Sequence, residues 1–379
     1  MKAVIVAYAR TPFHFARKGA LSTTRPEDLL ATAIRGALAQ APVPHDAIED
    51  VIAGCAYPEG PQGNNIARIA ASMAGLPNSV SAMTVNRFCG SSMTAVHLAA
   101  AQIDAGIGEA YVCAGVESMT MVPQGGLTFD PHPGLVSAGT DLYMPMGQTA
   151  ENVAERWAVS RADQEALALA SHQKAAAARA NGLLLDEIVP VTTPTGEVVS
   201  EDGCIRPQTT LEALASLKPA FRPDGVVTAG TSSPLTDGAA AVMVVHEDFA
   251  RRHGLKPLAR IVSYASAGVD PDVMGIGPVP ATRKALARAG LTAADLDVVE
   301  INEAFSSQAL ACIRELGLRP ETINLDGGGL AIGHPLGATG ARITGKAAAL
   351  LQRTKGRYAL ATQCIGGGQG VATVLENLA

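Results

Sequence analysis

The sequence predicts an α/β protein made of two similar βαβ-type halves, with a loop-rich insertion in the first half. Three observations lead to this fold class. Short β-branched runs alternate with segments of helical periodicity, and the order of these elements recurs in the second half. Residues 119–233 depart from this alternation, because loops of proline, glycine and threonine surround their helices. Hydrophobic residues make up 47% and charged residues 17%, with 39 glycines, which suits close-packed layers and a large subunit interface. We therefore expect a homodimer or homotetramer.

Length, charge and cysteine usage exclude several classes of protein. At 379 residues the chain exceeds one typical core and should form two or three domains. A net charge of −6 gives no sign of a nucleic-acid-binding surface, and no apolar run approaches the length of a membrane helix. Neither a disulfide scaffold nor a metal site is indicated by the six scattered cysteines, which are Cys55, Cys89, Cys113, Cys204, Cys312 and Cys364. We expect a reducing, cytoplasmic environment.

The first half alternates strands and helices up to Cys89. Its predicted elements are a strand over residues 3–9, a helix over residues 25–40, a strand over residues 51–55, a helix over residues 65–74 and an extended approach over residues 79–85. A run of small residues after Cys89 opens another helix, whose larger apolar positions keep a period near 3.6. Beyond that helix, residues 110–117 form a buried strand.

Cys89 should lie at the N-terminus of this helix. Unpaired N–H groups and the helix dipole there favour the thiolate, which is the nucleophilic form of cysteine. Gly90 and Ser91 leave room for an acyl group. The alternative is that Cys89 is one more buried cysteine, packed as a small hydrophobic side chain.

The second half repeats the order of the first. Its predicted elements are a helix over residues 280–289, a strand over residues 298–301, a small-residue helix from about residue 338 and a strand over residues 358–362. Ile52 precedes Cys89 by 37 positions, and Val299 precedes His334 by 35. Cys89 and His334 should therefore occupy equivalent corners of duplicated units, although two similar βαβ domains can also arise without a shared function.

Between the halves, proline, glycine and threonine loops surround two predicted helices. One covers residues 149–157, and a longer one begins at the capping pattern of Ser160 and ends at Asn181-Gly182. Residues 187–206 have the short β-branched runs and turns of a small sheet. A long excursion from a compact domain is usually a lid or a binding element.

Four segments carry residues suited to chemistry. They are the turn at Cys89, Asn302-Glu303-Ala304-Phe305, Gly333-His334-Pro335-Leu336-Gly337 and Cys364-Ile365-Gly366-Gly367-Gly368-Gln369-Gly370. Each alone has an ordinary explanation, since a Gly-His-Pro segment is a common tight turn and a glycine run lets helices pack closely. No Gly-Lys-Ser/Thr follows the glycine run, which argues against a phosphate-binding P-loop. Together the four segments indicate one site.

Seven segments, in the same order along the chain, resemble the signatures of the thiolase family. They are Cys89-Gly90-Ser91-Ser92, Met146-Gly147-Gln148-Thr149-Ala150-Glu151-Asn152, Thr228-Ala229-Gly230, Asp237-Gly238-Ala239-Ala240, Asn302-Glu303-Ala304-Phe305, Gly333-His334-Pro335 and Cys364-Ile365-Gly366. The resemblance covers essentially the whole chain and implies the thiolase fold, a five-layered αβαβα sandwich of two α/β halves. We expect an N-terminal half at residues 1–118, a loop domain covering the coenzyme A site at residues 119–233, a return at residues 234–256 and a C-terminal half at residues 257–379.

The resemblance also implies roles for the catalytic residues. Cys89 resembles the nucleophile that becomes acylated, His334 the base that activates it, and Cys364 the second cysteine, which moves a proton on the α-carbon or on coenzyme A. Asn302 would hold a water that stabilises the thioester oxyanion with His334, and the N–H groups of Cys89 and Gly366 would form a second oxyanion hole. Chemistry at a carbon–carbon bond next to a thioester requires such a nucleophile, base and sites for negative charge.

Contacts with coenzyme A follow from the same resemblance. Arg206 matches an arginine that packs on the adenine, and Ser233 matches a serine that contacts the pantetheine, whereas Met274, Ala304 and Phe305 match residues that line the pantetheine and acyl path. The ordinary alternatives are a solvated arginine, a turn serine and core side chains. The family uses coenzyme A as a co-substrate, with neither a metal nor a permanently bound cofactor.

Two departures from the family pattern bear on the subtype. Gly327-Gly328-Gly329 replaces a Gly-Gly-Ala that many relatives carry, and Pro145 stands where acetoacetyl-type thiolases have a histidine. The second departure resembles degradative 3-ketoacyl-CoA thiolases, the acetyl-CoA C-acyltransferases of fatty acid β-oxidation. A biosynthetic acetoacetyl-CoA thiolase is the near alternative. A decarboxylating ketoacyl synthase would not need Cys364, and an inactive lipid carrier should lack one of Cys89, His334 and Cys364.

Overall fold

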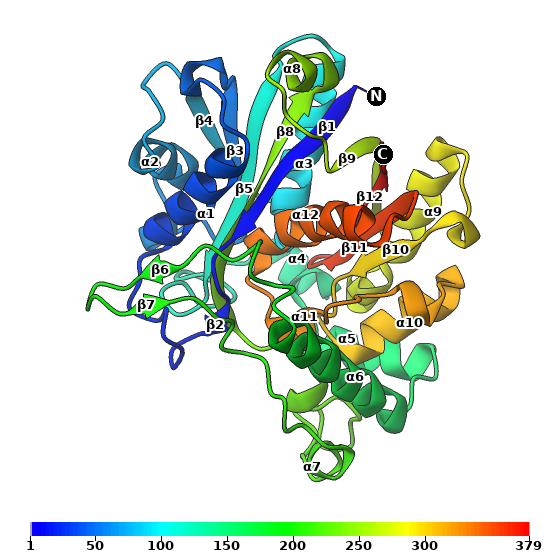
Figure 1. Ribbon diagram of the computed structural model, residues 1–379. Helices are drawn as coiled ribbons and strands as arrows, with labels where there is room; N and C mark the ends of the chain where they lie inside the picture. Colours follow the sequence, from blue (N-terminus) through cyan, green and yellow to red (C-terminus); the bar gives the residue numbers. More distant parts are fainter. Residues whose placement is uncertain (1, 379) are drawn as a thin grey trace.

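The computed structural model describes residues 2–378 and shows an α/β protein with one large sheet (Figure 1). The first half contains β1 (Ala3–Arg10), β2 (His14–Phe15), α1 (Pro26–Gln40), β3 (Asp50–Gly54), α2 (Ile66–Met73), β4 (Ser81–Val85), α3 (Ser91–Asp104) and β5 (Ala110–Ser118). The middle of the chain contains α4 (Pro133–Ser137), α5 (Met146–Arg156), α6 (Arg161–Ala180), β6 (Val191–Thr192), β7 (Val198–Val199) and α7 (Leu211–Ala215). The remainder contains β8 (Thr236–His246), α8 (Glu247–Arg252), β9 (Ala259–Gly268), α9 (Pro278–Ala289), β10 (Val298–Ile301), α10 (Ser306–Leu316), α11 (Gly329–Ile332), α12 (Leu336–Thr354), β11 (Tyr358–Ile365) and β12 (Gln369–Glu376).

The ten-stranded sheet has matching strand orders on the two sides of its centre. From the edge inward the order is β4-β3-β5-β8-β1 in the first half and β10-β11-β12-β9 in the second. β1 and β9 meet antiparallel at the centre through Val4–Arg260 and Ile5–Ala259. Where the first half has the edge strand β4, the second has a single parallel bridge between Val299 and Ile323. The predicted duplication is confirmed, with one strand reduced in the second half.

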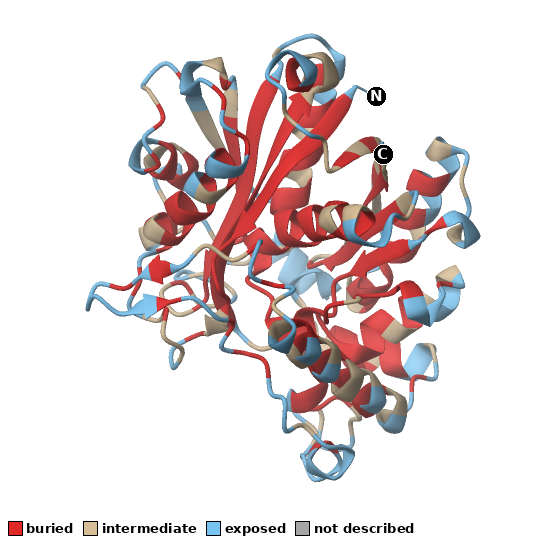
Figure 2. Ribbon diagram, viewed as in Figure 1, coloured by how far each residue is buried: buried red, intermediate tan, exposed pale blue. Residues whose placement is uncertain are grey.

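The two halves of the sheet form two β-layers, with helices outside each half and between them, which makes five layers in all. The three largest apolar cores lie between these layers. α1 and α2 cover the strands of the first half, and α9 and α10 cover those of the second. α3 and α12 pack together in the central layer, where Met93 and Val96 of α3 share one core with Ile343 and Leu350 of α12. Figure 2 shows β1, β5 and β8 buried along nearly their whole length. Because Cys89 precedes α3 and His334 precedes α12, the central layer brings the two predicted corners together.

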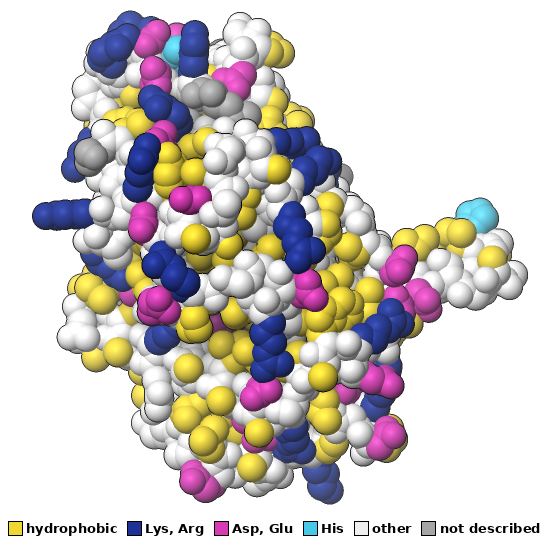
Figure 3. Space-filling model, turned by 90° about the vertical axis from the view of Figure 1, so that its right-hand side faces the viewer, with side chains coloured by type: hydrophobic (Ala, Val, Ile, Leu, Met, Phe, Trp, Pro, Cys, Tyr) yellow, Lys and Arg dark blue, Asp and Glu magenta, His cyan; other side chains and the backbone are white. Residues whose placement is uncertain are grey.

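The middle of the chain contains helices and long loops rather than a second layered body. Ser160 caps α6 by accepting a hydrogen bond from the Asp163 N–H at 3.1 Å, and α6 packs against α10 and α11. The small sheet predicted over residues 187–206 is limited to the two-residue strands β6 and β7. An arm that includes α4 stands away from the body (Figure 3). Its exposed apolar side chains are Leu127, Phe129, Leu135, Val136, Leu142 and Tyr143.

Candidate active site

Cys89 lies in a tight turn between β4 and α3. The Ser91 hydroxyl accepts a hydrogen bond from the Arg87 N–H at 2.9 Å and donates to the Phe88 carbonyl at 2.6 Å. Phe88 has a φ of 43°, a left-handed conformation that is uncommon for a residue with a side chain. Gly90 is required by a close approach, because a Cβ there would lie 2.4 Å from Cδ1 of Ile365. The turn therefore presses the Cys89 segment against the end of β11.

The Cys89 thiol is protonated in the free site. Its loss of hydration raises its pKa to about 12, and the nearby Glu117 carboxylate raises it further. Hydrogen bonds from the backbone N–H groups of Gly366 and Cys89 lower the pKa without reversing the shift. α3 begins only at Ser91, two residues beyond Cys89. The expectation of a resting thiolate is therefore wrong, and the nucleophile needs a base.

Cys364 belongs to the other half of the sheet and lies near Cys89. It is buried near the end of β11, where burial raises the pKa of its thiol and the neighbouring Cys89 and Cys312 thiols raise it further. The Gln363 side-chain amide donates to the carbonyl oxygen of Cys89. Both cysteines are thus held in reach of each other's electrostatic influence.

His334 is buried and fixed by three hydrogen-bonding contacts. Its backbone N–H donates to the Thr236 hydroxyl at 3.1 Å, and its Nδ1 lies 2.6 Å from the Thr339 hydroxyl. The Asn302 side-chain nitrogen lies 3.3 Å from its Nε2. Burial lowers the pKa of His334 to about 3, and the positive charge of Arg342 contributes in the same direction. His334 is therefore neutral at rest, as a proton acceptor must be.

Asn302 follows β10 and faces His334. Its backbone N–H donates to the Thr362 carbonyl at 3.0 Å, which extends the pairing of β10 with β11. Its Oδ1 is buried and has no hydrogen-bond partner among residues 2–378. A buried carbonyl oxygen without a partner is costly and suits a bound water or a polar group of a substrate.

An apolar cluster extends from Cys364 toward the middle segment of the chain. Met274, Ala304 and Phe305 belong to it together with Cys364, and Met146 packs against it. Ser233 is tied to the same place, because its N–H donates to the Ala304 carbonyl at 2.9 Å. Four of the five predicted coenzyme A contacts therefore lie together.

Arg206 lies apart from that cluster in its recorded contacts. Its guanidinium is exposed and sits 5.1 Å from the centre of the Phe15 ring, and its backbone N–H donates to His172 at 3.2 Å. Phe15 pairs with Thr236, the residue that accepts from the His334 backbone. Arg206, from the middle segment, is thus linked to the His334 backbone through Phe15 and Thr236.

Sequence reasoning missed Glu117, a buried carboxylate that joins both halves of the site. It accepts hydrogen bonds from the N–H of Ala56 at 2.9 Å, the Gln62 side chain at 2.8 Å and the N–H of Gly337 at 2.9 Å. Gly337 can come this close because it lacks a Cβ. A lone acidic residue inside the apolar strand of residues 110–118 was the available signal. Thr339, one helical turn beyond the histidine segment, left no comparable signal.

Other kinds of site find little support in the described chain. Two open grooves of about 480 and 420 Å³ lie beside α5 and share Arg222, and neither is lined by Cys89, His334 or Cys364. Within residues 2–378, no group of three or more His, Cys, Asp or Glu side chains is placed to hold a metal ion. No helix in that range is long and apolar enough to cross a membrane.

Comparisons with known proteins cover the whole chain. Family models described as "Thiolase, N-terminal domain" and "Thiolase, C-terminal domain" match residues 3–248 and 255–377. A 3-ketoacyl-CoA thiolase of Bacillus subtilis is 46% identical over 99% of both chains. A 3-oxoadipyl-CoA/3-oxo-5,6-dehydrosuberyl-CoA thiolase of Escherichia coli is 47% identical, over 95% of this chain and 96% of the relative. The crystal structure of human mitochondrial 3-ketoacyl-CoA thiolase superimposes with a TM-score of 0.92 and 39% identity, over 100% of this chain and 99% of that chain.

Proposed function

The chain belongs to the thiolase family of acyltransferases, and from this premise we propose that it is a 3-ketoacyl-CoA thiolase working through an acyl-Cys89 intermediate. The observation that carries the proposal is the set of groups around the Cys89 sulfur. Cys364 is its electrostatic neighbour, and the backbone N–H groups of Gly366 and Cys89 lower the pKa of its thiol. Cys89 also packs against an apolar cluster that includes Leu336, two residues after His334. This arrangement supplies a nucleophile, two proton carriers and a place for an oxyanion.

The first half-reaction forms the acyl-enzyme. His334 takes the proton of the Cys89 thiol as the sulfur attacks the 3-keto carbon of the substrate. The bond between C2 and C3 then breaks, and its electron pair stays on the acetyl-CoA enolate. Cys364 donates a proton to C2, so that acetyl-CoA leaves and the shortened acyl group remains on Cys89. Asn302 and His334, whose side-chain nitrogens lie 3.3 Å apart, would hold the thioester oxygen of that enolate.

The second half-reaction releases the acyl group. Cys364, left as a thiolate, takes the proton of incoming coenzyme A, whose sulfur attacks the acyl carbon. The N–H groups of Cys89 and Gly366, which lower the pKa of the Cys89 thiol, would stabilise the oxyanion on the attached carbonyl. Cys89 leaves and recovers its proton from His334. Coenzyme A acts as a co-substrate throughout, and no step calls for a metal or a resident cofactor.

The acyl group and coenzyme A would enter along the apolar cluster beside Cys364. Met274, Ala304 and Phe305 would line the pantetheine arm, and Ser233 would contact its amides. Arg206, exposed at the edge, would pack on the adenine. The proposed substrate class is a 3-ketoacyl-CoA, as in the last step of fatty acid β-oxidation.

A panel of substrates tests this function and its nearest rivals. Thiolysis should be measured by loss of the enolate absorbance for 3-ketoacyl-CoA esters of graded length, for acetoacetyl-CoA and for 3-oxoadipyl-CoA. We expect the highest kcat/KM on an unbranched 3-ketoacyl-CoA longer than acetoacetyl-CoA. A preference for acetoacetyl-CoA would favour the biosynthetic alternative. A preference for 3-oxoadipyl-CoA would assign the activity named for the Escherichia coli relative.

We also propose a homo-oligomer in a reducing, cytoplasmic environment. The edge strand β4 is only partly buried, and Phe88, just beyond it, is 37% exposed, which suits pairing with a second copy. All six cysteines are free. Light scattering coupled to size exclusion measures the oligomeric state, and a monomer at micromolar concentration would contradict the first part.

A further inference from the structure

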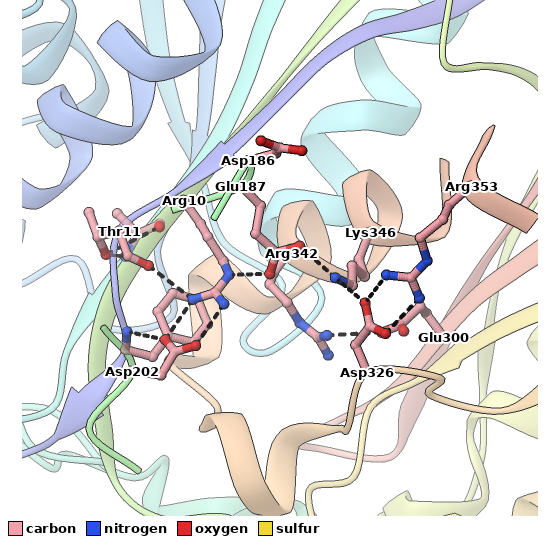
Figure 4. Close-up of polar contacts among 12 residues, drawn as sticks. Arg10, Thr11, Asp186, Glu187, Asp202, Glu300, Asp326, Arg342, Lys346 and Arg353 are labelled. Carbon is pink, nitrogen blue, oxygen red and sulfur yellow. Dashed lines mark hydrogen bonds and ion pairs between the residues drawn. The ribbon is translucent and has the colours of Figure 1, made fainter. Parts of the chain in front are cut away.

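Figure 4 shows a network of charged side chains that includes Arg10, Glu187 and Lys346. Lys346 contacts Glu187 at 2.7 Å and Asp326 at 2.6 Å, and Arg353 also pairs with Asp326. Arg10 holds Glu187 at 2.8 Å and Asp202 at 2.7 Å. Each of these acidic groups is therefore already matched to a base. Buried ion pairs are weak evidence for stability, because the cost of removing two charges from water can exceed their mutual attraction.

Arg342 and Glu300 form a separate pair within this network. Nη1 of Arg342 donates to Oε2 of Glu300 at 2.9 Å, and both side chains are at most 1% exposed. In the described chain, Arg342 makes no other ion pair. Its Nε and Nη2 and the second oxygen of Glu300 lack hydrogen-bond partners among residues 2–378. Glu300 is therefore the main compensation for the charge of Arg342.

The pair lies directly beneath the two residues proposed to handle the proton and the oxyanion. Glu300 lies on β10, and Asn302 follows the end of that strand and continues its pairing with β11, so side chains two positions apart here lie on the same side of the sheet. Thr339 and Arg342 are three positions apart on α12 and share a helix face. Asn302 and Thr339 are in turn the side chains that contact the ring of His334. The ion pair thus joins the two elements whose separation sets that geometry.

Electrostatics couples the same pair to the histidine. The charge of Arg342 lowers the pKa of His334, since it disfavours the imidazolium. Burial raises the pKa of Glu300 to about 7, although Arg342 and Lys346 lower it and Asp326 and Glu187 raise it. Tyr8 of β1 faces the same groups and stays neutral, because burial raises its pKa. The charge balance beneath His334 therefore depends on one carboxylate that is costly to ionise.

We propose that Glu300 is a positioning residue of the reaction, acting through Arg342. Its carboxylate anchors Arg342 and offsets its charge, so that His334, held beside Asn302, can take the proton of Cys89. This inference rests on the proposed function. Glu300 touches neither substrate nor reacting atoms, and its effect should appear in proton transfer rather than in substrate binding.

The pH dependence of Cys89 alkylation by iodoacetamide tests the proposal without any coenzyme A ester. At neutral pH alkylation depends on transfer of the thiol proton to His334, whereas at alkaline pH the thiol ionises by itself. Glu300→Gln keeps the shape and an acceptor oxygen but removes the charge. We expect the neutral rate to fall about tenfold, equivalent to one pKa unit at His334, while the alkaline limb is unchanged. An unchanged neutral rate would overturn the proposal.

A double variant separates charge compensation from mere structure. Glu300→Gln combined with Arg342→Gln removes both charges, and its neutral rate should recover to within about threefold of wild type. A double variant as slow as Glu300→Gln would overturn the proposal, as would a tenfold loss in the double variant if the single one does not fold. Asp202→Asn is the matched control, since this buried carboxylate pairs with Arg10 and should leave the shape of the profile unchanged.

Thiolysis by the wild-type enzyme keeps this test distinct from that of the proposed function. A wild-type enzyme that cleaves no 3-ketoacyl-CoA would overturn the function. An active wild type with a Glu300→Gln variant of normal kcat, normal KM and normal alkylation profile would overturn only the positioning role.

Discussion

The two corners that meet in the central layer occupy the same place in their halves and differ in exposure. The Cys89 corner keeps the edge strand β4, and its cysteine is only partly buried beside an exposed Phe88. At the His334 corner the counterpart of β4 is reduced to a single bridge between Val299 and Ile323, and the histidine is only 4% exposed. One half therefore presents a reactive group, and the other encloses one.

This difference follows from what each group must do. An acyl group has to reach the Cys89 sulfur, and the small residues Gly90 and Ser91 follow this cysteine. A base needs a fixed ring and a controlled charge, and His334 obtains both from Thr339, Asn302 and Arg342. Duplication supplies two equivalent helix N-termini, and the short segments before them determine their separate roles.

Removing the functional side chain of either corner gives the largest expected effects. Cys89→Ala should abolish acylation and lower turnover by at least about a thousandfold, because the covalent route is lost. His334→Ala should slow acylation by roughly a hundredfold or more at pH 7 and much less at alkaline pH, where Cys89 ionises without a base. Mass spectrometry of the enzyme after exposure to labelled acyl-CoA measures both. Normal acylation of His334→Ala at pH 7 would remove the histidine from its role.

Cys364 offers the next largest effect, because it should serve proton transfer alone. Cys364→Ala should still be acylated at Cys89, whereas turnover and exchange of the α-protons of acetyl-CoA should fall by about a hundredfold. Labelled acetyl-CoA in deuterated water reports acylation and exchange together. Cys312→Ala, which removes a neighbouring buried thiol, is the control. Wild-type exchange by Cys364→Ala would contradict the two-cysteine mechanism.

Acid should destabilise the central layer, where each half contributes a neutral buried histidine. Burial lowers the pKa of His97 on α3 to about 3, as it does for His334. Below pH 6.5 the unfolded chain binds protons that the folded histidines refuse, so stability falls as pH falls. At pH 5 this costs about 2 kcal/mol per histidine. Urea unfolding at pH 7 and pH 5 measures the loss, and His97→Gln should reduce it by about one histidine's share. Equal losses in the variant and the wild type would contradict this assignment.

Arg206 should give the smallest effect, because it lies outside both corners. Arg206→Ala should raise KM for coenzyme A by up to about tenfold with little change in kcat, since binding common to ground and transition states is lost. Steady-state kinetics at saturating 3-ketoacyl-CoA measures this. Arg251→Ala on α8, which removes another exposed arginine, is the control. An unchanged KM would exclude Arg206 from the site.

Much of the fold could be predicted because its outer helices and edge strands have clear periodicity. The predictions for α1, β3, α2 and α6 agree with the structure to within about two residues. β8 and β12 were not predicted, because central strands covered on both faces show no alternation of polar and apolar residues. β9 was also not predicted, although buried and half-buried residues alternate along it. Residues 187–206 illustrate the opposite case, in which β-branched residues form only two paired strands of two residues each, although Val191 and Val199 are buried.

The site residues could be located from motifs, but their ionisation could not. Helix position alone predicted a Cys89 thiolate, whereas burial and Glu117 raise the pKa of that thiol. Such effects depend on which distant segments cover a residue, and the sequence order does not contain that information. Glu300 and Arg342, 42 positions apart, form a pair only because β10 and α12 are neighbours.

The core shared by α3 and α12 has a consequence for how the molecule unfolds. Met93 and Val96 find their partners in Ile343 and Leu350, so neither half can complete its interior alone. The halves are joined in the sheet by only two residue pairs between β1 and β9. The shared core is therefore the main contact that holds them together. A fragment ending near residue 248 would leave the inner face of α3 uncovered and should aggregate instead of folding. The duplicated ancestry visible in the strand order therefore does not survive as two separable folding units.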